Sequence, residues 1–318
     1  MKFLPGSHAD EAVIQPDTFN APINVSGLST EVLAGLFHGA ASARAHWKPG
    51  LQLTAGLAGQ AESPGSAVHE LDLDDGQAVL RSGCPGKVLV ESGHRLSEDL
   101  LQPQSLYLLL AQQWARAGLM LVHGAAFEFE GHGVLALGDR GAGKSVLTMA
   151  ALAAGAKVVS DDWVMVGADA DGTVRCERLR EFLMLRHGLA HDRLLSALPG
   201  LQPLPLSSRP KSVVRMQEQP AELQAHFTTT CRIDRFWLLQ RRRTGRIPHS
   251  ERIPATSADA LSAVIRATMP LFFSRKFEHE AKRLRATAGR LATQIGASQV
   301  RTGTDILENP SSCLNYLL

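Results

Sequence analysis

The eight residues from Gly138 to Ser145 constrain this chain more than any other segment. They read Gly-Asp-Arg-Gly-Ala-Gly-Lys-Ser and match the pattern G-x-x-x-x-G-K-[ST]. A strand-like apolar run ends at Leu137, and a helical pattern follows from Lys144 to Ala154. We therefore predict an α/β fold in which a buried strand delivers a glycine-rich turn to the start of a helix.

The chemistry of a phosphate site explains the fixed positions of this loop. Glycine lets backbone N–H groups approach phosphate oxygens closely, and the start of a helix adds a dipole that favours anions. Lys144 can reach the β- and γ-phosphates, and the Ser145 hydroxyl can ligate Mg²⁺. The predicted nucleotide-binding residues are Gly138, Asp139, Arg140, Gly141, Ala142, Gly143, Lys144, Ser145 and Val146. The structural alternative is a glycine-rich turn before an ordinary helix, and the order of the glycines disfavours a dinucleotide site.

An acidic pair, Asp161 and Asp162, follows the β-branched run from Lys157 to Val159. The run predicts a buried strand, and in α/β sheets strand ends carry functional groups. Phosphoryl transfer needs a carboxylate that holds Mg²⁺, and transfer to a hydroxyl benefits from a second one that accepts the proton. We therefore expect a metal or catalytic role for the pair. The alternative is that one aspartate only caps the following turn.

Three further positions have two interpretations each. His123 lies in the strand-like segment from Leu119 to Phe129, where it is either a core histidine or a catalytic group. Lys211 follows a proline-rich segment and either stabilises transferred charge or belongs to a solvated loop. The basic turn from Arg241 to Arg246 either grips an acidic partner or forms a solvated hairpin tip.

Three segments together resemble the catalytic domain of HPr kinase/phosphorylase and its relatives. They are His123-Gly124-Ala125, the Gly138 to Ser145 loop and Val158-Val159-Ser160-Asp161-Asp162, in the family's order and approximate spacing. The resemblance covers Leu119 to Val166 well and continues weakly to about Gln240. It implies a mixed sheet flanked by helices, like the nucleotide-binding core of phosphoenolpyruvate carboxykinase. It also implies transfer of phosphate from ATP, with Mg²⁺, to a serine hydroxyl.

The resemblance implies a role for each matching residue. Lys144 and Ser145 would bind phosphate and Mg²⁺, and His123 would lie beside the reacting phosphate. Asp161 and Asp162 would supply the base and a metal contact, with Asp162 as the metal ligand.

The chain departs from the family after the acidic pair. The nearest match to the family's Leu-Glu-Ile-Arg-Gly-Leu-Gly segment begins Leu183-Met184-Leu185-Arg186. Arg186 keeps the arginine and its implied catalytic role, but Met184 stands where the family has a carboxylate. A thioether neither accepts a proton nor ligates Mg²⁺ usefully. The departure counts against a reverse phosphorylase reaction and against HPr as the substrate, and it indicates a divergent paralogue.

The chain is expected to divide near residue 95. Residues 1–95 are rich in Gly, Pro, Ser and Ala, with short strand-like runs, and predict a small β-rich N-terminal unit of unknown role. Residues 96–318 form the predicted HPr-kinase-like nucleotide-binding kinase domain.

Composition limits the partners. The formal net charge of +2 gives no excess that would favour nucleic acid or a membrane surface. The apolar runs are too short to span a bilayer, and we find no N-terminal signal peptide. The cysteines are Cys84, Cys176, Cys231 and Cys313, and their scattered positions predict neither a zinc site nor a redox motif. We therefore expect a cytoplasmic protein without nucleic-acid or membrane partners.

The leading interpretation is an ATP-dependent phosphotransferase that moves the γ-phosphate to a hydroxyl, a serine of a protein or peptide. A kinase of small molecules is an alternative of the same class. A regulatory module that binds ATP and transfers nothing is an alternative of a different class, favoured by Met184. ATP and Mg²⁺ are the expected ligands, and the resemblance adds the expectation of a homo-oligomer.

Overall fold

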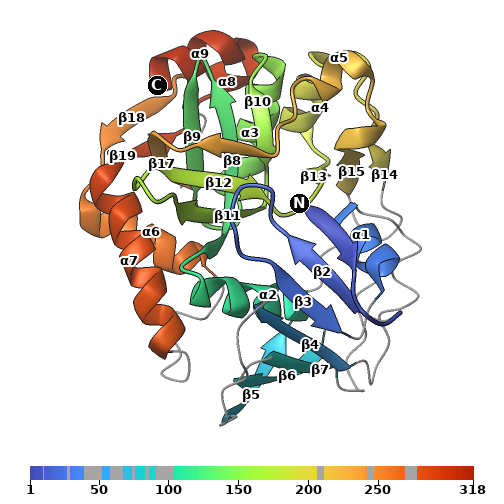
Figure 1. Cartoon of the computed structure of the whole chain (residues 1–318). Coiled ribbons are helices and arrows are strands. Elements are labelled where there is room, and N and C mark those ends of the chain that lie inside the picture. Colours follow the sequence, from blue (N-terminus) through green and yellow to red (C-terminus); the bar gives the residue numbers. More distant parts are fainter. Residues whose placement is uncertain are drawn as a thin grey trace. The chain divides into compact units, whose positions relative to one another are not determined.

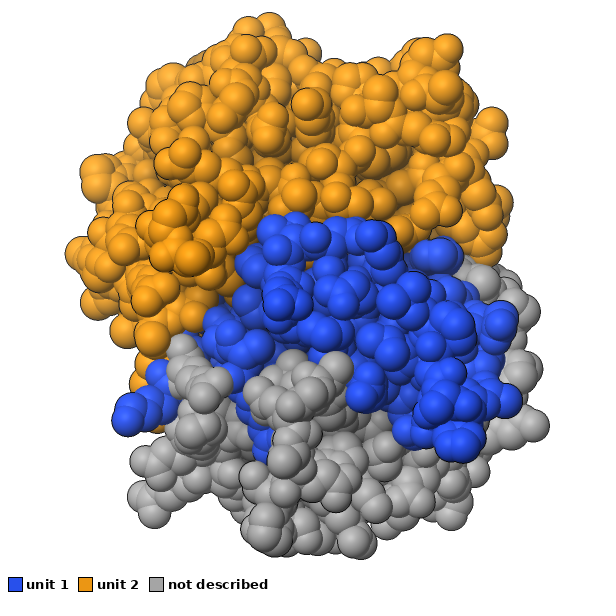
Figure 2. All heavy atoms as spheres, in the orientation of Figure 1, with its two compact units in different colours: residues 1–120, 269–284 blue, residues 121–268, 285–318 orange. Residues whose placement is uncertain are grey.

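The computed structural model describes residues 1–9, 11–26, 29–38, 52–57, 67–73, 76–82, 86–90, 104–205, 211–241, 247–268 and 278–318. The chain forms two compact units, which Figure 2 colours separately. The first comprises residues 1–120 and 269–284, and the second comprises residues 121–268 and 285–318. The roles predicted for residues 1–95 and 96–318 stay predictions.

The first unit contains an antiparallel sheet. Its described strands number seven and lie in the order β1-β2-β3-β4-β7-β6-β5. They are β1 (Lys2–Pro5), β2 (Glu11–Gln15), β3 (Ile23–Ser26), β4 (Gln52–Leu57), β5 (Ala67–Leu73), β6 (Gly76–Ser82) and β7 (Gly86–Val90). Two helices join it, α1 (Thr30–His38) and α2 (Gln104–Arg116). Trp114 of α2 is buried, and its indole N–H donates to the Ala21 carbonyl oxygen at 3.2 Å.

The second unit is built on a mixed sheet, which confirms the predicted mixed α/β architecture. Eight of its nine described strands follow one path, β16-β12-β11-β8-β9-β17-β19-β18, and β10 pairs with β8 beside that path (Figure 1). They are β8 (Met120–Phe129), β9 (His132–Leu137), β10 (Lys157–Ser160), β11 (Trp163–Ala168), β12 (Val174–Arg178), β16 (Thr230–Arg232), β17 (Arg235–Leu239), β18 (Glu251–Pro254) and β19 (Ala297–Arg301). Strands β9, β17 and β19 run parallel to one another, so their carboxyl ends meet at one edge.

A smaller sheet and several helices complete the described chain. The smaller sheet contains β13 (Phe182–Arg186), β15 (Lys211–Arg215) and β14 (Leu204–Pro205). The helices are α3 (Lys144–Ala153), α4 (Leu189–Ser196), η2 (Met216–Glu218), α5 (Ala221–Gln224), α6 (Ser257–Ala267), α7 (Glu278–Gln294), α8 (Asp305–Glu308) and α9 (Pro310–Leu317). Apolar side chains of α3, α4 and α9 pack with the inner face of the large sheet in one buried cluster, which includes Leu147, Leu194, Trp237 and Leu314.

The hairpin between β8 and β9 leads directly to the glycine-rich loop. Phe129 lies opposite His132, so Glu130 and Gly131 form a two-residue turn. Their φ angles are +50° and +76°, which is the geometry of a type I′ turn. Strand β9 ends at Leu137, immediately before the loop.

Two of the cysteines lie closer together than their sequence positions suggested. Cys176 on β12 lies opposite Cys231 on β16, and their sulfur atoms are 3.4 Å apart as buried free thiols. Strand pairing brings them together across 55 positions of the chain, a contact that spacing alone did not reveal.

Within the described residues, no helix combines the length and apolar character needed to cross a membrane.

Candidate active site

The glycine-rich loop lies at the edge where the parallel strands of the second unit end. It connects β9 to α3, beside the ends of β17 and β19. A side chain at Gly138 would begin only 2.8 Å from the Leu239 carbonyl oxygen at the end of β17. Glycine is thus required where the loop passes this strand. Ligands of open α/β sheets bind at such strand ends.

The loop's backbone is shaped for close approach to an anion. Gly141 and Gly143 have φ angles of +84° and +102°, which favour glycine. Gly143 is also the N-cap of α3, and among the described residues no side chain caps that position. The first N–H groups of α3 therefore lack the partner that a capping side chain would give them, which is the arrangement of a helix N-terminus that binds phosphate.

Lys144 begins α3 and points back into the loop. Its side chain is buried, and its Nζ donates to the Gly138 carbonyl oxygen at 2.7 Å and to that of Asp139 at 3.5 Å. Burial lowers the pKa of Lys144. The negative charges of Asp162, Asp139 and Asp161 raise it, but by less. The predicted phosphate-binding lysine and the acidic pair are thus close enough to interact electrostatically.

The acidic pair occupies the turn between β10 and β11. The Ser160 hydroxyl closes this turn by donating to the Trp163 carbonyl oxygen at 3.1 Å, and it accepts from the Asp162 N–H at 3.3 Å. The Asp162 carbonyl oxygen accepts from the Gly124 N–H of β8 at 2.6 Å. Serine, rather than either aspartate, makes the side-chain bonds that close the turn, so both carboxylates are turned to other partners.

Asp162 lies between two nitrogen groups. Its Oδ1 is 2.8 Å from Nε2 of His123, and its Oδ2 is 2.9 Å from a terminal guanidinium nitrogen of Arg180. Burial opposes ionisation of Asp162, but Arg180, His123 and Lys144 outweigh it and hold the pKa of this carboxyl well below its usual range. Asp162 is therefore ionised at neutral pH.

Asp161 has the opposite environment. It is only 4% exposed, and its Oδ2 accepts a hydrogen bond from the Met184 N–H at 3.1 Å. Burial and the negative charge of Asp162 raise the pKa of Asp161 to about 7. Adjacent carboxyls with pKa values moved in opposite directions are the usual arrangement when one group holds charge and the other exchanges a proton.

His123 is placed by β8 at the rim of this cluster. Its ring lies 5.3 Å from that of Trp163, centroid to centroid, and its side chain is 40% exposed. His123 is therefore bonded to Asp162 on one side and open to solvent on the other. The sequence left open whether it belonged to the core, and the exposure shows that it does not.

Arg180 is the residue that sequence reasoning missed. It lies in the connection between β12 and β13, is 2% exposed, and stacks over the Phe182 ring at 5.3 Å from the centroid. Nothing in the local pattern distinguishes it from the neighbouring Arg178. The one weak signal for Arg180 in the sequence is that it lies between the apolar residues Leu179 and Phe182, just before Met184.

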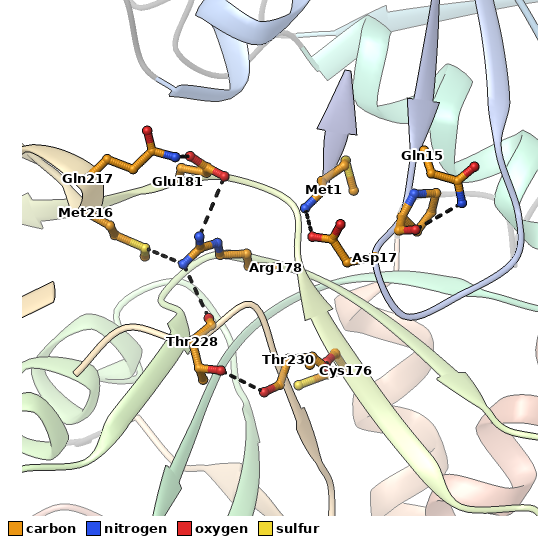
Figure 3. A network of polar contacts seen from close by, with 11 residues as sticks. Met1, Gln15, Asp17, Cys176, Arg178, Glu181, Met216, Gln217, Thr228 and Thr230 are labelled. Carbon is orange, nitrogen blue, oxygen red and sulfur yellow. Dashed lines mark hydrogen bonds and ion pairs between the residues drawn. The ribbon is translucent and has the colours of Figure 1, made fainter. Parts of the chain in front are cut away.

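Arg178, whose contacts Figure 3 shows, ends β12 and begins the connection to β13. Its guanidinium lies 3.6 Å from the Glu181 carboxylate, 3.3 Å from the Met216 sulfur and 3.4 Å from the Thr228 carbonyl oxygen. Gln217 also donates to Glu181. These contacts fix both ends of the connection, which explains how a buried arginine is held against Asp162.

Arg186 and Lys211, the other predicted catalytic residues, lie opposite each other on β13 and β15. Arg186 is exposed, and no contact joins it to Asp161 or Asp162 within the described residues. The acidic pair instead meets this strand through Met184, whose backbone N–H binds Asp161 and whose sulfur lies 3.8 Å from Arg180.

A cavity of about 460 Å³ adjoins the loop. Its wall combines residues of the loop, the ends of β17 and β19, helix α6 and β8. The charged and polar groups in it are His123, Asp139, Arg140, Gln240, Arg241, Asp259, Ser262, Arg266 and Gln299. Of the basic turn predicted from Arg241 to Arg246, residues 242–246 lie outside the described residues.

Among the described residues, no three His, Cys, Asp or Glu side chains are grouped to hold a metal ion. Magnesium that arrives with a nucleotide needs only one or two carboxylates, because phosphate oxygens and water fill the other positions. The Asp162 carboxylate and the hydroxyl of the half-buried Ser145 are oxygen groups that would ligate such an ion.

No protein-family model matches the chain. No curated protein matches it in sequence. Among solved structures, the chain is similar to the Hpr(Ser) kinase/phosphatase from Coxiella burnetii, with 8% sequence identity and a TM-score of 0.32 over 62% of this chain and 94% of that chain. This is a distant structural relationship, and the chemistry proposed below rests on the site's own residues.

Proposed function

We propose that this chain is an ATP-dependent phosphotransferase that moves the γ-phosphate of ATP to a hydroxyl, a serine of a protein or peptide. The observation that carries the proposal is the meeting of two separate elements, the glycine-rich loop and the turn between β10 and β11. A buried lysine in a glycine-rich loop interacts with an acidic pair whose two pKa values are moved in opposite directions. A loop that only turned the chain would need no such partner.

Each group then has a role in the transfer. The loop and the start of α3 bind the phosphates through backbone N–H groups, and Lys144 exchanges its bond to Gly138 for the phosphate oxygens. The acceptor oxygen forms a bond to the γ-phosphorus while the bond from phosphorus to the β-phosphate oxygen breaks, and ADP leaves. Asp161 takes the proton of the acceptor hydroxyl, because its pKa of about 7 suits a base at neutral pH.

Asp162 and His123 support this step. Asp162 stays ionised through Arg180 and, with the Ser145 hydroxyl, would hold Mg²⁺. When bound, Mg²⁺ would neutralise charge on the phosphate oxygens. His123 is bonded to Asp162 and exposed at the rim, where it fixes the carboxylate's orientation.

A second candidate is a regulatory module that binds Mg-ATP and transfers nothing. Met184 favours it, since a thioether next to Arg180 stands where a further carboxylate is implied by the family resemblance. The raised pKa of Asp161 favours transfer, because a group that only binds metal has no need of a pKa near neutrality.

A transfer assay separates these functions. Purified protein is incubated with γ-labelled ATP and Mg²⁺ against lysate fractions, synthetic serine peptides and low-mass metabolites, with Lys144→Ala and Asp161→Asn beside it. We expect label on a discrete protein or peptide, and its loss in both variants. Label only on low-mass metabolites would indicate a small-molecule kinase. Mg-ATP binding without transfer to any fraction would refute the transferase and leave the regulatory module.

A further inference from the structure

The cavity beside the loop also reaches His123 at the rim of the acidic cluster. One part of its wall is Gly138, Asp139 and Arg140 of the loop, and another is His123. His123 is bonded to Asp162, so the cavity extends from the loop to the edge of the acidic cluster. A molecule bound in it would contact the loop, where the phosphates of ATP are proposed to lie, and His123, which is bonded to Asp162.

The charges in the cavity leave a positive excess. Three guanidinium groups face two carboxylates. Asp259 is held by the Thr256 N–H and hydroxyl at 3.1 and 2.7 Å as part of the capping box of α6. Asp139 lies 3.8 Å from Arg266, a pair exposed to solvent. Both carboxylates therefore have partners of their own.

Among the residues that the structure describes, the other two arginines have no such partner. Within the described residues, neither Arg140 nor Arg241 forms an ion pair. Nε of Arg241 lies 3.9 Å from the point where a side chain at Gly141 would begin, so this cation lies against the loop's open backbone. Two unpaired guanidinium groups beside a polar cavity suit a carboxylate or a phosphate, which arginine binds with paired hydrogen bonds.

We propose that this cavity binds the phosphate acceptor, and that the acceptor carries an anionic group, a carboxylate or a phosphate, close to its hydroxyl. Arg241 and Arg140 bind the anionic group, and the hydroxyl lies toward His123 and the loop. The inference rests on the phosphoryl transfer proposed above and adds that the acceptor is anionic; a peptide source agrees with the proposed acceptor, and a small-molecule source would indicate the small-molecule kinase instead. The anionic group has two sources, an acidic residue near a serine in a peptide or a small hydroxy acid or sugar acid phosphate.

Calorimetric titration into protein saturated with Mg²⁺ and the non-hydrolysable analogue AMPPNP tests this. The nucleotide fills the loop, so the probes report on the cavity. The peptide arm compares Ac-Glu-Ser-Glu-NH₂ with Ac-Gln-Ser-Gln-NH₂, and the small-molecule arm compares 3-phosphoglycerate with glycerol. The variants are Arg241→Gln and, as a matched control, Arg193→Gln, an exposed arginine on α4 that does not line the cavity.

We expect one anionic probe to bind saturably while its uncharged counterpart does not, and the responding arm identifies the source. Arg241→Gln should weaken that binding by about tenfold or more, as the loss of a charge-assisted pair does, whereas Arg193→Gln should leave it unchanged. Failure of both anionic probes to bind, or equal binding to the Arg241→Gln protein, would overturn the inference. The AMPPNP titration that comes first tests the proposed function separately: no nucleotide binding contradicts that function, whereas nucleotide binding without probe binding contradicts only this inference.

Discussion

The glycine-rich loop and the acidic cluster are held together by different physical means. The loop uses backbone groups of consecutive residues, with φ angles of +84° and +102° at two glycines, and its outer residues are exposed. The acidic cluster uses side chains from β8, the turn before β11 and the connection before β13, and its ion pair with Arg180 is almost fully buried. Changes in the loop should thus affect ligand binding, and changes in the cluster should affect folding and proton exchange as well.

The largest effect is expected from breaking the buried ion pair. Arg180→Met should lower the free energy of unfolding by about 4 kcal/mol, because it leaves the Asp162 charge buried without its main partner. Urea denaturation measures it. The matched control is Arg301→Met, which removes an exposed pair with Glu251 and should cost less than about 1 kcal/mol. If the two variants lost the same free energy of unfolding, burial would not make the Arg180–Asp162 pair more important for stability than an exposed pair.

The next effect belongs to the loop. Lys144→Ala should reduce the rate of phosphoryl transfer by about a hundredfold or more, because a charged donor to the transferred phosphate is removed. The unfolding midpoint should hardly fall, since the mutation removes a buried cation whose pKa burial already lowers. Lys157→Ala, at the exposed start of β10, is the control and should keep full activity. A large loss of stability with Lys144→Ala would place this lysine among the folding determinants instead.

The contribution of Asp161 to the free energy of unfolding should depend on pH. Asp161 has a folded pKa raised to about 7, so the folded state binds the proton more tightly than the unfolded state between about pH 4 and 7. Stability contributed by this group is therefore present at low pH and is lost as the pH rises through 7.

Asp161→Asn removes that loss and keeps an acceptor for the Met184 N–H. It should be more stable than the parent by on the order of 2 kcal/mol at pH 8 and similar to it near pH 4. Asp192→Asn, on the surface of α4, should differ by less than about 0.5 kcal/mol at every pH. Urea titrations at several pH values measure this, and a constant difference across the range would contradict the assigned pKa.

The smallest effect is expected from alanine at two glycines with nearly the same φ angle, one in the loop and one outside it. Comparing them separates the cost of backbone strain from the loss of ligand binding. Gly141 in the loop and Gly172 in a surface turn have φ angles of +84° and +85°. Alanine at either position should cost about 1 kcal/mol of stability, because both force an L-residue into the left-handed region. Gly141→Ala should also weaken AMPPNP binding, whereas Gly172→Ala should not. Unchanged affinity in the Gly141→Ala protein would mean that the loop backbone does not touch the nucleotide.

The same physical difference explains how far the sequence could predict the site. The loop and the hairpin turn at Glu130-Gly131 depend on neighbouring residues, so a contiguous pattern predicts them. Asp161 and Asp162 could be nominated as carboxylates that follow a predicted strand, and His123 as a histidine within one. That Asp162 is bonded to both His123 and Arg180 depends on strands paired across the sheet, which no local pattern contains.

Met184 and Arg180 show the limit most clearly. The sequence identified Met184 as a missing carboxylate, yet the fold uses its backbone N–H to bind Asp161. Every residue except proline has such an N–H, so side-chain chemistry could not predict the contact. Arg180 and Arg178 are two arginines two positions apart, and only tertiary packing decides which one reaches Asp162. Strand β11 (Trp163–Ala168) was also not predicted, although its apolar run with Trp163, Val164 and Val166 is typical of a buried strand.

The central claim is that the loop and the acidic cluster act as one site for Mg-ATP, and a double-mutant cycle tests it most directly. AMPPNP affinity is measured with and without Mg²⁺ for the parent, Lys144→Ala, Asp162→Asn and the double variant. We predict that each single change weakens Mg-dependent binding and that the double variant loses less than the sum, with a coupling energy of about 1 kcal/mol or more. Additive losses, or an Asp162→Asn protein that binds Mg-AMPPNP like the parent, would show that the two elements are independent and would contradict the account.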